Sequence, residues 1–266
     1  MIPRPPSTPG HTPADRLARG LAVALLAGAA LAARMAVAGE FAVHPMRLEL
    51  GGGIRSSALT LRNDDTVPLS FQVQGMEWTQ DDDGQDRYQD ATDLVYFPRR
   101  LTVAPGQEAV VRVGLRQGVV PVEKAYRLFI EELAPPAPLP VPGQAPKIRV
   151  MVRFGAPLFV RPAQPVQQLL LDGLALAEGQ ARWRLRNAGN QHEAFERIAL
   201  RGFDATGAEA FALPLAERYL LAGRTRQFSI PVPALACGQL ARLAVEVTTD
   251  KSEVRQQVDL GTPSCR

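Results

Sequence analysis

The chain has 266 residues, of which 21% are charged and 46% hydrophobic, and its formal net charge is +3 at pH 7. The basic residues are scattered and form no run rich in lysine and arginine, so nucleic acid is not an expected partner. A chain of this length can bury substantial cores and suits two domains of ordinary size, with one large sandwich as the alternative.

The first segment, 1–38, has the features of a secretory signal. Basic residues precede an apolar run at 21–33, which ends shortly before the small residues Ala36, Val37 and Ala38. The apolar run is shorter than the roughly 20 residues that a membrane-spanning helix needs. We therefore expect cleavage after residue 38, export of the remaining chain, and no membrane span after cleavage. An uncleaved membrane anchor is the alternative.

From residue 41 onward, short runs of alternating apolar and polar residues are divided by turn residues. Examples are 58–62, which precedes Asn63, and 69–74. Such strand candidates recur about every ten residues, and beyond the signal no segment keeps a helical period over several turns. This spacing predicts an all-β chain built from antiparallel sandwiches rather than a parallel α/β fold.

A strand with two different faces is predicted at 147–154, directly after the proline-rich stretch 134–143. Four apolar residues of one parity share a face of this strand: Ile148, Val150, Val152 and Phe154. This apolar row can face the protein's own core. It can also be offered to another protein as an added strand, because a long proline loop is typical of a chain that reaches an exposed sheet edge.

Beyond Pro162 the pattern of strands begins again, which predicts an N-terminal domain at 39–161 and a C-terminal domain at 162–266. Cys237 and Cys265 are the only cysteines of the chain. An even pair in an exported protein indicates one disulfide, which would fix the C-terminal strand to its sheet. Two free buried cysteines are the alternative.

The sequence offers few residues for catalysis or metal binding. The exported part contains only His44 and His192, and neither has the spacing of a nucleophile motif or a metal site. The run 81–84 resembles part of a calcium loop, but Thr79 occupies the first ligand position, so we interpret it as a solvated hairpin loop. No paired carboxylates suggest a carbohydrate-active enzyme. We expect neither enzymatic activity nor a cofactor.

A series of short motifs resembles the periplasmic pilus-assembly chaperones of the chaperone–usher pathway, and the motifs occur in the family's order. They are Pro45-Met46-Arg47, 59–63, 95–98, 103–106, 111–113, Glu123 with 126–133, and 157–162. Each motif alone is weak, but their order after a signal is specific. The resemblance covers essentially the whole exported chain, although beyond Pro162 it rests on size, strand count and cysteine use.

The resemblance implies two immunoglobulin-like domains set at an angle, an interdomain cleft, no catalytic activity, and a location in the periplasm. Pilus subunits of this pathway lack the last strand of their own sandwich. The chaperone completes a subunit with its seventh strand and passes it to an outer-membrane usher. Aligned on 158–162, the donor positions fall on Ile148, Val150 and Val152, and Phe154 continues the row.

Chaperones of this family also hold the C-terminal carboxylate of the subunit with two basic residues. Arg47 matches the first of them, whereas the lysine of the best-known members falls on Pro157 in this chain. Arg153 lies four residues earlier with the same parity, so we expect it to supply the second positive charge. A basic residue there, followed by Phe154, is similar to the archaic branch, whose pili include those of spore-coat-U type subunits.

The resemblance further implies a charge network at the domain junction, for which Glu123, Arg161 and Asp250 occupy matching positions. An exposed turn aspartate beside Lys251 is the alternative for Asp250. A different functional class is a structural or adhesive surface sandwich, such as a pilus subunit. Two complete sandwiches, and strands that begin close to the expected cleavage site, favour the chaperone.

Overall fold

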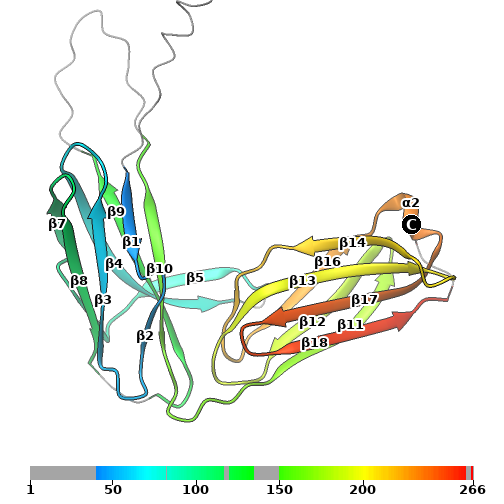
Figure 1. The fold of residues 1–266 in the computed structure, drawn as a ribbon. Coiled ribbons are helices and arrows are strands. Elements are labelled where there is room, and N and C mark those ends of the chain that lie inside the picture. Colours follow the sequence, from blue (N-terminus) through cyan, green and yellow to red (C-terminus); the bar gives the residue numbers. More distant parts are fainter. Residues whose placement is uncertain (1–39, 82, 117–119, 135–149, 262–264, 266) are drawn as a thin grey trace, which may run out of the picture. The chain divides into compact units, whose positions relative to one another are not determined.

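The computed structural model describes residues 40–81, 83–116, 120–134, 150–261 and 265 (Figure 1). Within these residues nearly all regular structure is β-strand, and the only helix is the single turn α2 (Ala234–Cys237). No helix in the described ranges is long and apolar enough to cross a membrane. The prediction of an all-β chain is confirmed. The expected signal and Ile148 lie outside the described residues.

Ten strands form the N-terminal sandwich: β1 (Phe41–His44), β2 (Leu48–Leu50), β3 (Ser56–Asn63), β4 (Leu69–Gln80), β5 (Asp86–Asp90), β6 (Leu94–Phe97), β7 (Arg100–Val103), β8 (Glu108–Leu115), β9 (Lys124–Leu133) and β10 (Arg153–Val160). One sheet has the order β1-β3-β8-β6, and the other has the order β2-β10-β9-β4-β5 with β7 also on β4. Alternate residues of these strands meet in one hydrophobic core that includes Leu61, Phe71 and Tyr126.

The first two strands belong to different sheets, which determines where Arg47 lies. β1 pairs with β3 in one sheet, whereas β2 pairs in parallel with β10 in the other, and Arg47 lies in the bend between them. β2 covers β10 only along Leu158–Val160. The preceding residues of β10, from Arg153 to Pro157, pair with β9 alone among the described strands.

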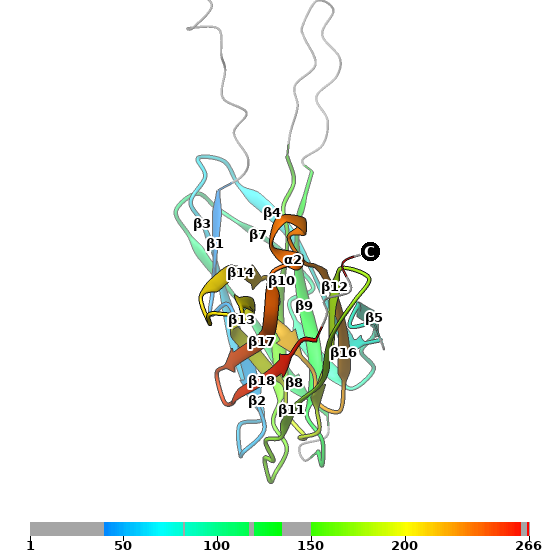
Figure 2. The same ribbon diagram turned by 90° about the vertical axis from the view of Figure 1, so that its right-hand side faces the viewer.

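Eight strands form the C-terminal sandwich: β11 (Leu169–Ala177), β12 (Gln180–Asn187), β13 (Glu193–Asp204), β14 (Glu209–Leu215), β15 (Tyr219–Leu220), β16 (Thr225–Pro231), β17 (Leu240–Thr249) and β18 (Glu253–Asp259). Its sheets have the orders β11-β12-β16 and β14-β13-β17-β18, with β15 also on β13. In Figure 2, β12 and β16 lie on one side of this sandwich and β13 and β14 on the other. Trp183, Leu185, Leu200 and Val245 are buried between the two sheets.

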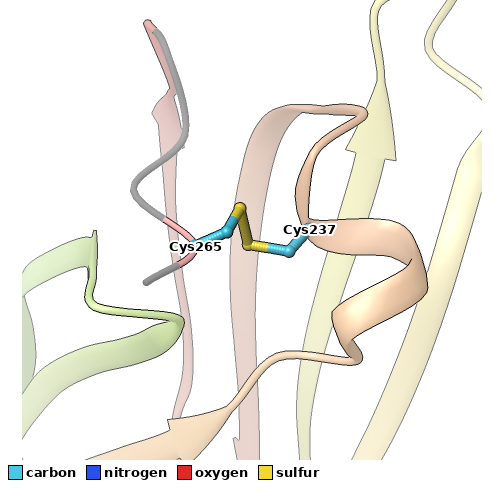
Figure 3. The surroundings of a disulfide bond; sticks show 2 residues. All are labelled: Cys237 and Cys265. Atoms are coloured by element: carbon cyan, nitrogen blue, oxygen red, sulfur yellow. A yellow bond between two sulfur atoms is a disulfide. The ribbon is translucent and has the colours of Figure 1, made fainter.

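A disulfide joins the two cysteines within the C-terminal sandwich (Figure 3). Cys237 is the last residue of α2 and Cys265 follows β18, and their Cα atoms lie 5.9 Å apart. The closed segment of 28 residues contains β17 and β18. The C-terminal end of the chain is therefore tied to the turn that precedes β17.

Candidate functional site

The predicted apolar row continues into β10, and its members differ in exposure. Val150 precedes β10 in the chain, and it is 51% exposed. Val152 is half-buried, and its carbonyl oxygen accepts a hydrogen bond of 3.0 Å from the Glu132 amide. Phe154 is half-buried against the core of the N-terminal sandwich. Phe154, which continues the apolar row, therefore also packs against the protein's own core.

The outer edge of β10 can pair with a further strand. Where β2 does not cover it, between Arg153 and Pro157, the backbone has one neighbouring strand, β9, among the described residues. An edge of this kind presents N–H and C=O groups that can pair with another chain. Pro157 has no N–H group, so the ladder of a partner strand would lose one donor at that position.

Strand register brings two arginines to either side of Pro157. Leu48 of β2 pairs with Leu158, and Arg127 of β9 pairs with Pro157. Leu48 and Leu158 are buried in the core. Their sequence neighbours therefore face away from the core, because successive residues of a strand point to opposite faces. Pro157 and Arg127 consequently lie side by side on one sheet face, and Arg47 immediately precedes β2 on the other side of β10.

Arg47 already has one carboxylate neighbour. Its Nη2 atom lies 3.3 Å from Oε1 of Glu49, and its side chain is partly exposed. Glu49 also pairs with the guanidinium of Arg161, because β2 runs beside the end of β10 and the Arg161 amide donates to Leu50. Arg161 therefore pairs with Glu49 and not with Glu123. The expected charge network required a pair between Arg161 and Glu123, so this part of the expectation is wrong.

Arg127 was not predicted as a site residue, although it is the more enclosed of the basic groups near Pro157. Its side chain is 14% exposed, and its guanidinium carbon lies 3.9 Å from the ring centroid of Trp78. Nη1 donates to the carbonyl of Gly155 at 3.3 Å, and Nη2 lies 3.9 Å from an Asp86 carboxylate oxygen. The alternation of residues along β9 indicates that the Arg127 side chain points away from the core. Its position opposite Pro157 depends on the register between β9 and β10.

Arg153, the predicted second cation, lies farther along β10. Its side chain is 48% exposed, and Nε lies 3.8 Å from the Glu131 carboxylate. Its guanidinium carbon is 4.1 Å from the ring centroid of Phe129. Four residues separate Arg153 from Pro157, which is about 13 Å along a strand. Arg153 is thus placed beside the apolar row rather than beside Arg47.

The expected network of Glu123, Arg161 and Asp250 is replaced by other pairs. Glu123 accepts a hydrogen bond of 2.9 Å from the His192 amide, and its carboxylate oxygens lie 2.8 and 3.0 Å from Nδ1 of His192. These side chains are only 2% and 5% exposed. Asp250 accepts from the Ala194 amide and pairs with Lys251. Burial raises the pKa of Asp250, but hydrogen bonds from Lys251 and Ala194 outweigh burial and hold that pKa below its usual range.

The loop at 81–84 has the contacts of a tight turn. The carboxylate of Asp81 accepts hydrogen bonds from the amides of Asp83 and Gln85 and pairs with Arg87. Its oxygens are therefore engaged by the protein itself, in agreement with a solvated hairpin loop. Among the described residues, no group of three or more His, Cys, Asp or Glu could hold a metal ion.

Comparison with known proteins identifies the N-terminal sandwich. Residues 40–165 match the family described as pili and flagellar-assembly chaperone, PapD N-terminal domain. The N-terminal sandwich belongs to this chaperone family. The resemblance inferred from the ordered motifs is therefore confirmed. A comparison of the sequence with curated proteins found no match.

Solved structures with a similar fold include chaperones, two of them in complex with a pilus subunit. The CsuC–CsuE chaperone–tip adhesion subunit complex of archaic Csu pili from Acinetobacter baumannii has a TM-score of 0.55 and 17% identity, covering 82% of this chain and 97% of that one. The Salmonella enterica SafA pilin–SafB chaperone complex has a TM-score of 0.54 and 13% identity, with coverages of 85% and 99%. The E. coli chaperone DraB has a TM-score of 0.51 and 16% identity, with coverages of 85% and 98%. At these levels of sequence identity, the structural similarity shows the fold, which is the predicted pair of β-sandwiches.

Proposed function

We propose that this protein is a periplasmic chaperone that binds pilus subunits by donating a strand to them and delivers them to an outer-membrane usher. The main observation behind the proposal is the edge of β10 between Arg153 and Pro157, which β2 does not cover. This edge directly follows Val150 and Val152 of the apolar row. The family of residues 40–165 supports it, as do similar structures whose chaperones are bound to pilus subunits.

The donated residues in this proposal are Ile148, Val150 and Val152, with Phe154 at the junction with the core. Burying an aliphatic side chain of this size contributes about 1.5–3 kcal/mol, so three of them supply roughly 5–9 kcal/mol before the costs of association. Backbone hydrogen bonds along the edge of β10 add directionality and set the register of the partner strand. The combination suits a partner whose own core is incomplete.

The same proposal assigns a carboxylate-binding role to Arg47. Its guanidinium lies beside the end of the open edge, and its one close carboxylate neighbour, Glu49, is shared with Arg161. A subunit carboxylate at this position would accept charge-assisted hydrogen bonds, which are shorter and stronger than neutral ones. Arg153 is the second cation that sequence reasoning suggests, and its contribution can be tested in the same complex.

The test is co-production of the chaperone with a pilus subunit encoded beside it, followed by isolation of the periplasmic complex. Val150→Asp with Val152→Asp should abolish capture, because two charges would enter an apolar groove. Val95→Asp with Val110→Asp is a matched control, since these valines are 48% and 46% exposed on the other sheet. Full capture by the Val150/Val152 variant, with normal folding, would refute strand donation.

A further inference from the structure

We propose that Phe129 is a specificity-determining residue, which selects subunits that carry a large apolar side chain beside Gly155 in the strand that pairs with β10. This inference rests on the proposed function, because it concerns the specificity of the same open edge. Three observations support it. They are the direction of the backbone at Gly155, the lack of a side chain there, and the fixed position of the Phe129 ring.

The backbone of Gly155 faces the open edge of β10. The Glu132 amide donates to the Val152 carbonyl, so even-numbered residues along this strand direct their hydrogen-bonding groups toward β9. The Arg161 amide donates to Leu50 of β2, on the opposite edge. Odd-numbered residues therefore direct their groups to that edge, and Gly155 lies in the part of it that precedes the pairing with β2. A partner strand would pair directly beside Gly155.

The Phe129 ring lies over Gly155. The two residues are paired in register, and Phe129 faces away from the core because its neighbours Leu128 and Ile130 are buried. A Cβ atom added to Gly155 would lie 3.0 Å from the nearest atom of the Phe129 ring. The ring thus occupies part of the space that a side chain of β10 would fill. A glycine inside a strand often marks a close approach of this kind.

Two neighbours hold the Phe129 ring in position. The guanidinium carbon of Arg153 lies 4.1 Å from the ring centroid, and the Tyr88 ring meets it in a T-shaped contact with centroids 5.2 Å apart. Phe129 nevertheless remains only half-buried. A ring that is already ordered loses little conformational freedom when a partner packs against it. Phe129 therefore offers a prepared apolar surface next to the open edge.

The geometry at Gly155 favours a large side chain on the partner strand. Residues directly opposite each other on neighbouring strands share a face, so the partner residue beside Gly155 would project on the same side as Phe129. About two strand spacings, or roughly 10 Å, would separate its Cα atom from that of Phe129. Because the residue between them has no side chain, an aromatic, leucine or methionine side chain can cross this gap and pack on the ring. An alanine is too short to reach it.

The test uses a pilus subunit encoded beside the chaperone. The crystal structure of the wild-type complex identifies the subunit residue beside Gly155, and this residue is then changed to alanine. Native and alanine forms of the subunit are each produced together with wild-type and variant chaperones that carry different tags. The ratio of subunit recovered on the two tags measures the relative affinity of the two chaperones.

We expect Phe129→Ala to lose the native subunit to the wild type by about three- to tenfold, and Phe129→Leu to lose less. With the alanine form of the subunit the two chaperones should share it about equally, because the contact is already absent. Phe203→Ala is a matched control. Phe203 is also half-buried beneath an arginine, Arg242, whose guanidinium carbon lies 4.9 Å from the ring centroid, but it belongs to the C-terminal sandwich. This variant should compete like the wild type.

The inference is overturned if Phe129→Ala and wild type share the native subunit equally, if the loss is as large with the alanine form, or if the residue beside Gly155 is small. Thermal unfolding shows whether Phe129→Ala still folds, and Phe129→Leu supplies the test if it does not. Failure of the proposed function gives a different result, because Val150→Asp with Val152→Asp would then capture the subunit normally.

Discussion

The rings of Phe159 and His192 are stacked, with their centroids 3.6 Å apart and their planes inclined by 12°. Phe159 belongs to β10, the strand whose first part carries the apolar row, whereas His192 immediately precedes β13 of the C-terminal sandwich. The imidazole also contacts the Glu123 carboxylate, and both polar side chains are buried. This aromatic and polar contact is a joint between the two sets of strands.

Replacing His192 by alanine should lower the free energy of unfolding by about 3 kcal/mol, because the buried Glu123 carboxylate would keep only the main-chain amide and lose the imidazole, and Phe159 would lose its stacked ring. Urea denaturation followed by circular dichroism measures the loss. His44→Ala, at an exposed position in β1, should change stability by no more than about 0.5 kcal/mol. Equal effects of the two substitutions would contradict the importance of this joint.

Asp93 should support the N-terminal sandwich in a pH-dependent manner. Its carboxylate accepts hydrogen bonds from Lys124 at 2.7 Å and from the buried Tyr126 hydroxyl at 2.9 Å. Burial raises the pKa of Asp93, but the contacts from Lys124 and Tyr126 outweigh burial and leave this pKa below its ordinary value. Asp93→Asn should therefore reduce stability by about 1–2 kcal/mol at pH 7.

The sign of this pH dependence follows from the lowered pKa in the folded state. The stabilisation from Asp93 is fully present above the ordinary aspartate pKa of about 3.9 and is lost as pH falls through the lower folded-state value. Denaturation curves at several pH values should show the difference between wild type and Asp93→Asn shrinking below about pH 4. Asp90→Asn, at an exposed position in β5, serves as the control. A difference that persists undiminished at pH 2 would rule out the assigned role.

The disulfide should stabilise the C-terminal sandwich selectively. Replacing Cys237 and Cys265 by alanine removes the closure of a 28-residue segment, which corresponds to about 3–4 kcal/mol in the chain-entropy description. Trp183 lies in the core of this sandwich, whereas Trp78 of β4 packs against Phe159 and Leu221 outside the N-terminal core, so variants with a single tryptophan place one reporter in the C-terminal core and one outside it. The alanine variant should shift the Trp183 transition more than the Trp78 transition. Equal shifts would show that the two sandwiches unfold as one unit.

Asn187 should be essential to the loop that leads to His192. Its side-chain amide is buried and donates to the carbonyls of Gln191 and Leu220 at 2.7 and 3.1 Å, while its oxygen accepts from the Gly189 amide. Asn187→Asp keeps the shape but removes both donors, so we expect a loss of about 2–3 kcal/mol. Thermal unfolding measures it, and a melting temperature like that of the wild type would exclude this role. Asn190→Asp, at a position whose hydrogen bonds are exposed, is a less severe comparison.

Much of the fold could be predicted from local patterns. Alternation in segments such as 58–62 identifies strands, and the restart after Pro162 separates two sandwiches, because side-chain direction along a strand depends only on parity. The apolar row at Val150 and Val152 was found in the same way. The pairing of Cys237 with Cys265 needed no geometry, since the chain contains no other cysteine.

The charged partners could not be predicted by the same reasoning. Arg161 was expected beside Glu123, but it pairs with Glu49, and His192 takes the place next to Glu123. Arg153 has the parity required of a second cation, yet Arg127 is the arginine opposite Pro157. Parity indicates on which face of a sheet a side chain lies. Which residues are in contact is decided by how the neighbouring strands are aligned along their length.

The amino-acid sequence by itself thus determined the strands, the two sandwiches and the apolar row that precedes β10, because these depend on the order of side chains along one chain segment. Only the tertiary structure decided which polar groups meet. A shift of two residues between paired strands leaves every side chain on the same face, so alternation cannot specify register. The placement of Arg127 beside Pro157, 30 residues away in the chain, results from how all the strands of the sheet pack together on one core.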